Sequence, residues 1–276
     1  MSGPNRFSIG DAEAGGPGLL VVAGPCLVES EDLCLRVAER LKALCAARGL
    51  PFVFKASYRK ANRSSGRSFA GLPVDQALEV LARVRREFGV PVLTDIHEEA
   101  DVPAAAAVAD VLQIPAFLCR QTGLLVAAAK TGKAVNVKKG QFLAPGDMAN
   151  AIEKVTTAGG SRVLLTERGT TFGYGDLVVD MRGLVIMREL GWPVLFDATH
   201  SLQRPGGKET GGDRRFAFPL MRAAVACGVD GLFFETHPDP ARAMSDAATQ
   251  LPLDQAEAFL DEACRVRDAV KEKVRA

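Results

Sequence analysis

Short apolar runs recur along the chain at nearly regular intervals, and this rhythm restricts the fold more than any other feature. Eight such runs, rich in β-branched residues, start 21 to 38 residues apart. Continuous apolar strands are buried on both faces, which is typical of parallel sheets. The pattern therefore predicts eight parallel strands, at Leu19–Ala23, Phe52–Ala56, Val90–Thr94, Val111–Ile114, Ala134–Val137, Val163–Thr166, Val194–Asp197 and Leu232–Phe234.

Amphipathic segments lie between many of these runs. Pro73–Phe88 has proline at its start and Gly89 behind it, the usual helix start and stop. Strand–helix units of about 30 residues predict the α/β class and a (β/α)8 TIM barrel, with a doubly wound open sheet as the alternative. The other predicted helices are Glu31–Ala47, Asp147–Thr157, Leu177–Leu190, Phe218–Cys227 and Asp254–Arg275.

The barrel is expected to be a single domain over residues 18–276. Residues 1–17, rich in Gly and Pro, are expected to be an N-terminal extension in which Arg6–Ile9 forms a short strand closing one end of the fold.

Charge and composition exclude several classes of partner. The net charge is +1, so no overall field would hold nucleic acid or an anionic membrane. The N-terminus lacks a secretory pattern, and no apolar run approaches the roughly 20 residues of a membrane span. Six cysteines without CxxC spacing argue against a disulfide framework. We therefore expect a cytoplasmic protein that binds neither nucleic acid nor membranes.

Polar and charged residues follow every predicted strand. In a barrel these strand ends converge on one rim, where active sites form. Cations held together there would repel one another unless anions filled the site. Two phosphates and a carboxylate approach five negative charges, which suggests two phosphorylated substrates or one phosphorylated twice. The five rim cations are Lys55, Lys60, Arg63, Lys138 and Arg168, whereas Lys139 and Arg59 are interpreted as surface charges.

A second group on the rim could bind a metal. A thiolate, an imidazole and two carboxylates suit Zn, Fe(II), Mn or Co better than Mg or Ca, because the thiolate is soft. The candidate ligands are Cys26, His200, Glu235 and Asp246. His97 and His237 compete with His200, although His237, next to Pro238, is expected to orient its loop.

Neutral hydrogen-bonding residues complete the rim. A polyhydroxylated substrate would need such groups, and the candidates are Asn62, Ser64, Gln113 and Asp95. The segment Arg204–Asp213 contains four glycines and is expected to be a mobile loop and a candidate lid.

Several of these stretches together resemble the 3-deoxy-D-manno-octulosonate 8-phosphate (KDO8P) synthases. The resemblance runs from about residue 19 to the end, and Lys60-Ala-Asn-Arg-Ser-Ser65 is specific to this group. The other matching stretches are Ala23–Glu29, Phe54-Lys-Ala-Ser57, Thr94–His97, Asn136–Phe142, Leu165–Tyr174, Phe196–His200 and Glu235–Asp239.

This resemblance implies an activity and an assembly. The family condenses phosphoenolpyruvate (PEP) with D-arabinose 5-phosphate and water and releases phosphate, in lipopolysaccharide precursor synthesis. Cys26 after Gly24-Pro25 implies the metal-dependent form of the family, because the metal-independent form has Asn there. A homotetramer is also implied, in which a neighbouring subunit's loop completes the sugar-phosphate site, with Arg63 as the candidate residue.

The resemblance further assigns roles to the rim residues. Lys60, Lys138 and Arg168 are expected to clamp PEP, with Lys55 and Gln113 beside them. Asn62, Arg63 and Ser64 are expected to hold the sugar phosphate. The residues expected to be catalytic are Asp95, His200, Lys138 and Asn62.

Three alternatives remain open at this point. A relative that uses erythrose 4-phosphate shares the chemistry but carries a different basic loop. A Schiff-base aldolase would use Lys138 as its nucleophile. A phosphosugar-binding barrel without activity would not need both the ligand set and the five cations.

Overall fold

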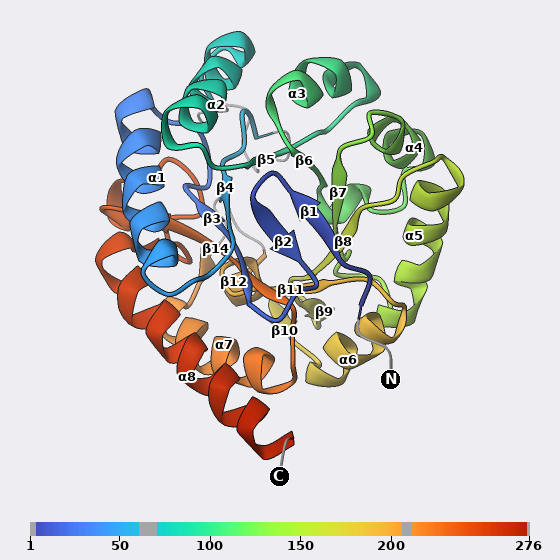
Figure 1. Cartoon of the computed structure of the whole chain (residues 1–276), viewed down its shortest axis with the longest axis vertical. Helices are drawn as coiled ribbons and strands as arrows, with labels where there is room; N and C mark the ends of the chain where they lie inside the picture. Colours follow the sequence, from blue (N-terminus) through green and yellow to red (C-terminus); the bar gives the residue numbers. More distant parts are fainter. Residues whose placement is uncertain (1–3, 61–70, 206–210, 275–276) are drawn as a thin grey trace.

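Eight parallel strands close into a barrel in the computed structural model, which describes residues 4–60, 71–205 and 211–274, with side chains to residue 270 (Figure 1). The first and last strands of the row β11-β8-β7-β6-β5-β4-β3-β14 also pair with each other, so the predicted (β/α)8 barrel is confirmed and an open sheet is excluded. The barrel strands are β3 (Leu20–Gly24), β4 (Phe52–Lys55), β5 (Val92–Asp95), β6 (Val111–Ile114), β7 (Ala134–Lys138), β8 (Val163–Glu167), β11 (Val194–Asp197) and β14 (Gly231–His237).

Helices surround the barrel and cover its outer face (Figure 1). The Ser30 hydroxyl accepts from the Leu33 amide to begin the first helix, and Gly89 ends the second at φ 62°. The helices are α1 (Glu31–Ala46), α2 (Val74–Phe88), α3 (Val102–Val108), α4 (Thr122–Lys130), α5 (Met148–Thr157), α6 (Met181–Glu189), α7 (Ala217–Ala226) and α8 (Ala256–Val274). The short, alanine-rich α3 and α4 were not predicted, because they contain almost no polar residues to mark an amphipathic pattern.

The predicted helix Leu177–Leu190 begins too early. A hairpin of β9 (Thr170–Phe172) and β10 (Asp176–Val178) precedes it, with Gly173 at φ 72° in the turn. The helix α6 starts only at Met181, where the Asp180 carboxylate accepts from the Arg182 amide. The β-branched and aromatic residues of β9 favour a strand here.

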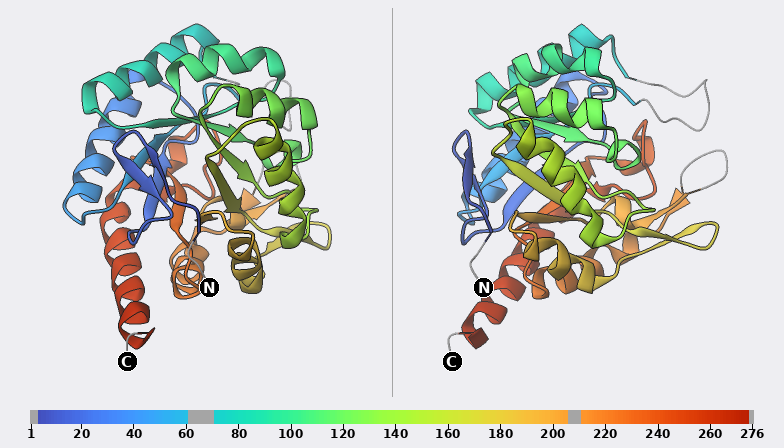
Figure 2. Two further views of the ribbon diagram at one scale, coloured as in Figure 1. Left: turned by 45° about the vertical axis from the view of Figure 1, so that its right-hand side comes forward. Right: turned by 90° about the vertical axis from the view of Figure 1, so that its right-hand side faces the viewer.

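The N-terminal residues form a hairpin across one end of the barrel, as expected for Arg6–Ile9. Its strands are β1 (Phe7–Ile9) and β2 (Ala12–Ala14). Ile9, Ala12 and Ala14 pack into the cluster of apolar side chains inside the barrel. Figure 2 shows this hairpin on the side opposite the β9–β10 hairpin, so the carboxyl ends of the strands remain uncovered by it.

Short elements shape the loops beyond the strands. They are β12 (Gln203–Arg204), β13 (Gly211–Gly212), β15 (Leu251–Pro252) and the 3-10 turns η1 (Glu99–Asp101), η2 (Ala116–Leu118), η3 (Pro145–Asp147), η4 (His200–Leu202), η5 (Arg214–Phe216), η6 (Pro240–Arg242) and η7 (Leu253–Gln255). Among the described residues, none of the helices is long and apolar enough to cross a membrane.

Inside the barrel, a layer of apolar side chains is followed by a layer of mainly polar residues nearer the carboxyl ends of the strands. Its apolar layer consists of Val22, Val53, Leu93, Val111, Ala134, Leu164, Leu195 and Phe233. Side chains of a strand alternate between faces, so the residue two positions further along points inward again. These next residues, which we call the polar ring, are Gly24, Lys55, Asp95, Gln113, Asn136, Thr166, Asp197 and Glu235.

Candidate active site

One buried ion pair lies across the position where the polar ring has a glycine, Gly24, in place of a larger side chain. Lys55 and Glu235, 1% and 0% exposed, form a salt bridge although the strand β3 lies between their strands. Gly24 occupies the intervening position, and a Cβ atom there would lie 2.0 Å from the Lys55 carbonyl oxygen. The Lys55 ammonium also donates to the Cys26 carbonyl at 3.0 Å. Glycine is therefore required at position 24, where β3 and β4 approach each other.

A second ion pair joins Lys138 to Asp197 and orients His200. Asp197 Oδ1 accepts from the backbone amides of Thr199 and His200 at 3.0 and 2.9 Å. Its other oxygen pairs with Lys138 and lies 2.8 Å from His200 Nδ1. Burial would raise the pKa of Asp197, but His200 and Lys138 outweigh it and hold the pKa well below its ordinary value. His200 consequently turns Nε2 toward Glu235, at 3.6 Å from Oε1.

Two further cations are held close to these pairs. Arg168 is buried, and its Nη2 donates to Gln203 Oε1 at 2.5 Å, whereas Nη1 has no hydrogen-bond partner in the described part of the chain. Burial lowers the pKa of Arg168. Burial also opposes the charge on Lys60, but Cys26, Glu235 and Asp95 outweigh it and raise its pKa. An unpartnered buried guanidinium nitrogen is costly unless an anion binds it.

Three potential metal ligands converge beside the ion pairs. One ligand atom each from Cys26, Glu235 and Asp246 lie within 4.8 Å of one another. Cys26 Sγ is 3.1 Å from Asp246 Oδ2. Glu235 Oε2 is buried with no hydrogen-bond partner from any described residue. With His200 Nε2 facing Glu235, these donors fit a transition metal, because a cation would satisfy the orphaned oxygen and stabilise the thiolate.

The pKa of the Cys26 thiol reflects the negative charge already present among the candidate metal ligands. Burial, followed by the charge of Glu235, raises the pKa of Cys26 well above its ordinary value. A bound cation reverses this balance, since a coordinating thiol is deprotonated outright.

Residues outside the sequence prediction support the ligands. Asp246 has φ 47°, the single positive φ of a non-glycine residue in the described ranges, which strained sites often show. Gln203 bridges Arg168 and Asp246, donating to Asp246 Oδ1 at 2.8 Å. Gln250 Oε1 accepts from the Cys26 amide at 3.4 Å. Of the missed residues, only Asp197 had a sequence signal, as a strand-end carboxylate three positions before His200.

Lys139 is not a surface charge, as the sequence had suggested, but is 0% exposed. Its ammonium donates to the carbonyls of Gly140 and Leu143 and to Thr170 Oγ1, at 3.0 to 3.2 Å, and lies 3.7 Å from Glu167 Oε2. Lys138 and Lys139 are consecutive, so one points into the barrel and the other into the layer between strands and helices. Arg59, interpreted in the same way, is partly buried and pairs with Asp101 at 2.8 Å.

The predicted residues of the basic loop cannot be placed. Asn62, Arg63 and Ser64, and residues 206–210 of the proposed lid Arg204–Asp213, lie outside the described residues. Asp95 and Gln113 do lie in the polar ring, hydrogen-bonded to each other.

Among the described residues the ligand group consists of Cys26, Glu235 and Asp246, so all three histidines lie outside it, but His200 Nε2 faces Glu235 Oε1 at 3.6 Å. His237 Nδ1 accepts from the Asp239 amide at 3.0 Å, as expected of a residue that orients its loop. His97 packs edge-on against Tyr58.

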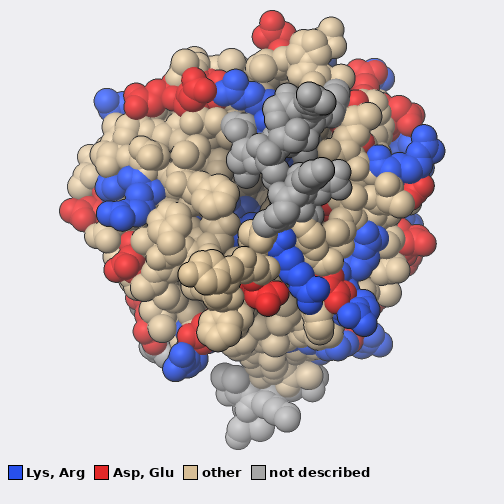
Figure 3. All heavy atoms as spheres, turned by 180° about the vertical axis from the view of Figure 1, so that it is seen from behind, with Lys and Arg blue, Asp and Glu red and all other residues tan. Residues whose placement is uncertain are grey.

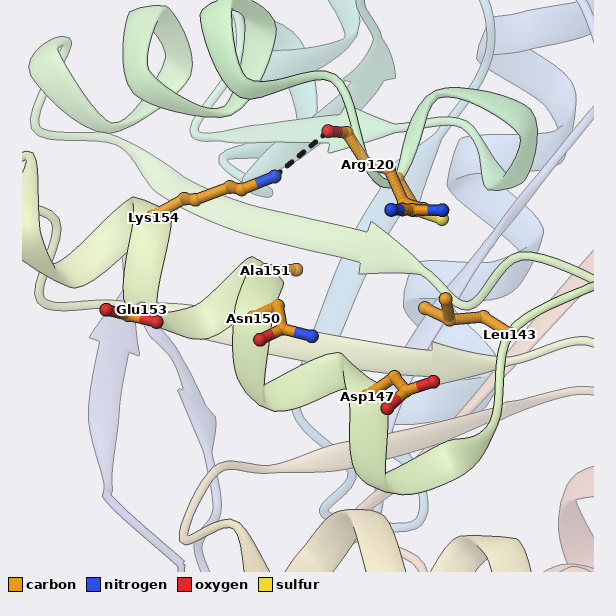
Figure 4. A pocket seen from close by; sticks show the side chains of 8 residues that line it. Arg120, Leu143, Asp147, Asn150, Ala151, Glu153 and Lys154 are labelled. Atoms are coloured by element: carbon orange, nitrogen blue, oxygen red, sulfur yellow. Dashed lines mark hydrogen bonds between the residues drawn. The ribbon is translucent and has the colours of Figure 1, made fainter.

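The cavities outside the barrel mouth have a different chemistry. One of about 210 Å³ lies between the η2–α4 and η3–α5 segments, with Arg120, Lys154, Asp147 and Glu153 in its lining (Figure 4). Lys154 donates to the Arg120 carbonyl at 3.0 Å there. Because both signs of charge line it, this cavity does not match a multiply charged anion.

Comparison with known proteins places the chain in a family. A sequence profile described as the DAHP synthetase I family matches residues 7–272. The chain belongs to the DAHP synthetase I family.

Similar curated proteins carry the name 2-dehydro-3-deoxyphosphooctonate aldolase. One from Trichlorobacter lovleyi is 56% identical over 92% of this chain and 95% of its own length. Another from Syntrophotalea carbinolica is 53% identical over 97% and 98%. One from Methylibium petroleiphilum is 55% identical over 91% of each chain.

Membership of the DAHP synthetase I family means that the protein is an enzyme, and the non-catalytic binding barrel is excluded. The family match begins within β1 and ends within α8, so it includes the whole barrel and the hairpin beneath it.

Proposed function

We propose that the protein is a KDO8P synthase, which joins PEP to D-arabinose 5-phosphate. The observation that carries the proposal is a set of cations at the barrel mouth beside a convergent group of metal ligands. Of these cations, Lys55, Lys138 and Arg168 are buried and Lys60 is partly buried. The name carried by relatives at 53–56% identity supports the same reaction.

PEP would bind among the cations of the barrel mouth. The Arg168 Nη1 atom without a partner in the described structure, together with Lys138 and Lys60, supplies donors for a phosphate and a carboxylate. Arginine can hold such groups with two parallel hydrogen bonds, and lysine acts as a point charge. In this interpretation Lys55 is held by Glu235 and contributes its charge without leaving that partner.

The sugar phosphate would bind toward the Lys60 end of the mouth. Asn62, Arg63 and Ser64 are proposed to hold its phosphate, and Asp95 to lie near the aldehyde. Burial would raise the pKa of Asp95, but Lys55 and Lys60 outweigh it and hold the pKa well below its ordinary value. Asp95 is therefore a fixed anion throughout the reaction.

The reaction forms a bond from the enol carbon of PEP to the aldehyde carbon, adds the oxygen of water to the neighbouring carbon, and releases phosphate. Negative charge grows on the former aldehyde oxygen and positive charge on the carbon that takes up water. The cations neutralise the departing phosphate, and Asp197 keeps the His200 ring oriented at Nδ1. A divalent metal held by Cys26, His200, Glu235 and Asp246 would supply Lewis acidity in this site.

We further propose a homotetramer in which Arg63 reaches a neighbouring subunit's site. Support comes from exposed aromatic side chains after the strands β6, β7 and β8, among them Phe117, Phe142, Phe172 and Tyr174. Phe172 is 72% exposed, which is unusual for phenylalanine without a covering partner. Figure 3 views the face opposite the N-terminal hairpin, where a broad uncharged area adjoins basic side chains. Light scattering of the purified protein tests the assembly.

A phosphate-release assay tests the function. PEP is supplied with arabinose 5-phosphate or with erythrose 4-phosphate, each with and without a chelator. We expect turnover with arabinose 5-phosphate and loss of turnover after verified metal removal. Turnover with erythrose 4-phosphate alone would refute the substrate, and full activity of the metal-free protein would refute the ligand role of Cys26.

One observation favours the Schiff-base aldolase as a second candidate. Burial lowers the pKa of Lys138 to about 8, which would make part of the amine nucleophilic near neutral pH. The pairing with Asp197 keeps the pKa of Lys138 from falling further, because it stabilises the ammonium form. Borohydride trapping with pyruvate separates the candidates: covalent labelling of Lys138 would support the aldolase.

A further inference from the structure

Half of the polar ring is a continuous chain of hydrogen bonds between neighbouring strands. Asp95, Gln113 and Asn136 are direct partners in the register of β5, β6 and β7. Thr166, on β8, lies opposite Lys138 in the register and continues the chain through its hydroxyl. Asn136 and Thr166 are both 0% exposed, so their polar groups need hydrogen-bond partners within the protein.

Every donor in this chain points toward Asp95. The Thr166 hydroxyl donates to Asn136 Oδ1 at 2.7 Å, and Asn136 Nδ2 donates to Gln113 Oε1 at 2.8 Å. Gln113 Nε2 then donates to Asp95 Oδ1, while Ser57 donates to the other carboxylate oxygen at 2.5 Å. An ionised carboxylate only accepts hydrogen bonds, so Asp95 sets the direction of the whole chain.

This chain of hydrogen bonds allows only one orientation of the Gln113 amide. If that amide rotated by half a turn, its oxygen would face the Asp95 carboxylate and its nitrogen would face the donor of Asn136. Two hydrogen bonds would become two repulsive contacts between buried groups. Without Asn136 and Thr166, only the contact with Asp95 would oppose this rotation.

We propose that Asn136 and Thr166 are positioning residues of the reaction, which act through Gln113 by holding its amide nitrogen toward the anion-binding mouth. The inference rests on the proposed function, because that function places Gln113 beside PEP. In a mouth lined by cations, an amide nitrogen attracts an anionic substrate and an amide oxygen repels it. An isosteric leucine at position 136 would fill the same space, so packing alone does not require a buried amide there.

A double-mutant cycle tests whether Thr166 acts through Gln113. Thr166→Val removes the first donor at almost constant volume, and Thr166→Ser keeps it. We expect Thr166→Val to lower kcat/KM for PEP roughly tenfold and Thr166→Ser to restore most of it. In a Gln113→Met background, Thr166→Val should cause no further loss, since the group it positions is gone.

Thr94→Val is the matched control. Thr94 is also fully buried on a barrel strand, but among the described residues its hydroxyl bonds to the backbone groups of Ala56 and Tyr58 and to no side chain. This variant should lower the melting temperature as much as Thr166→Val without the change in kcat/KM. Equal kinetic losses in both variants, or an additive loss in the Gln113→Met background, would overturn the proposal.

Calorimetric titration with PEP separates this inference from the proposed function, because it needs no turnover. We expect Thr166→Val, and not Thr94→Val, to weaken PEP binding. Equal PEP affinity of wild type and Thr166→Val would refute the positioning role even in an enzyme that makes KDO8P. Absence of turnover in the wild type, with the expected loss of PEP affinity in Thr166→Val, would refute only the proposed function.

Discussion

The charge of Lys138 should be lost near pH 8, and this loss should be visible in the kinetics. The ammonium is buried, pairs with Asp197 and lies 3.1 Å from the centre of the Phe233 ring. Burial is the largest effect, and it lowers the pKa of Lys138 from 10.5 to about 8 in spite of the carboxylate. This shift corresponds to about 3 kcal/mol against the charged form.

The expected effect on PEP capture follows from this pKa. A group with a pKa of about 8 is roughly nine-tenths charged at pH 7 and roughly one-tenth charged at pH 9. If only the ammonium binds PEP, kcat/KM for PEP should fall about tenfold between these values. The kcat at saturating PEP should change less, because the bound anion favours the ammonium. Phosphate release measured across this range at constant ionic strength gives both constants.

Lys138→Arg is the control, because a guanidinium stays charged throughout the range. Its kcat/KM should be lower overall but flat through pH 9. A rise of the wild-type kcat/KM through pH 8 would refute the reasoning, since it would mean that the neutral amine is the active form, as in a Schiff-base aldolase.

Three further predictions concern the metal and the fold. Cys26→Ser should lower the bound metal measured by elemental analysis, because a hydroxyl replaces the soft ligand. Lys139→Met should reduce the free energy of unfolding in denaturant titrations by about 3–5 kcal/mol by leaving Glu167 buried without its cation, and adding Glu167→Gln should recover most of that loss. Gly24→Ala should yield no folded protein by circular dichroism, because its Cβ would lie 2.0 Å from a carbonyl oxygen, whereas Gly89→Ala, with open space and φ 62°, should cost only about 1 kcal/mol.

The barrel could be predicted because its signals are local. Each strand is a short apolar run, and caps such as Ser30 and Gly89 lie next to the helices they begin or end. Where local contrast was weak, as in the alanine-rich α3, the prediction failed. The hairpin before α6 failed for another reason: the start of that helix depends on Asp180, a capping residue that the apolar pattern beginning at Leu177 does not reveal.

Lys139 shows what a residue-by-residue interpretation lacks. Two consecutive lysines at a strand end must point to opposite sides, and the sequence already contains that fact. In an open surface strand the outer side is solvent, so a surface charge is the natural interpretation. In a closed barrel the outer side is covered by helices, and Lys139 needs Glu167 and three oxygen acceptors to remain there.

The chemical types of the polar ring could be read from the sequence, but its pairings depend on closure. Lys55 and Glu235 are 180 positions apart, and only the closed barrel brings their strands to either side of β3. The same closure divides the ring into two halves. The Lys55–Glu235 pair and the metal ligands lie around β14, β3 and β4, and the neutral chain lies along β5 to β8. The Lys138–Asp197 pair connects β7 with β11. Asp95 joins the halves, since it ends the neutral chain and lies in the field of Lys55 and Lys60. In the proposed route a change at Thr166 acts through Asn136 and Gln113, which is why its effect should disappear when Gln113 is removed.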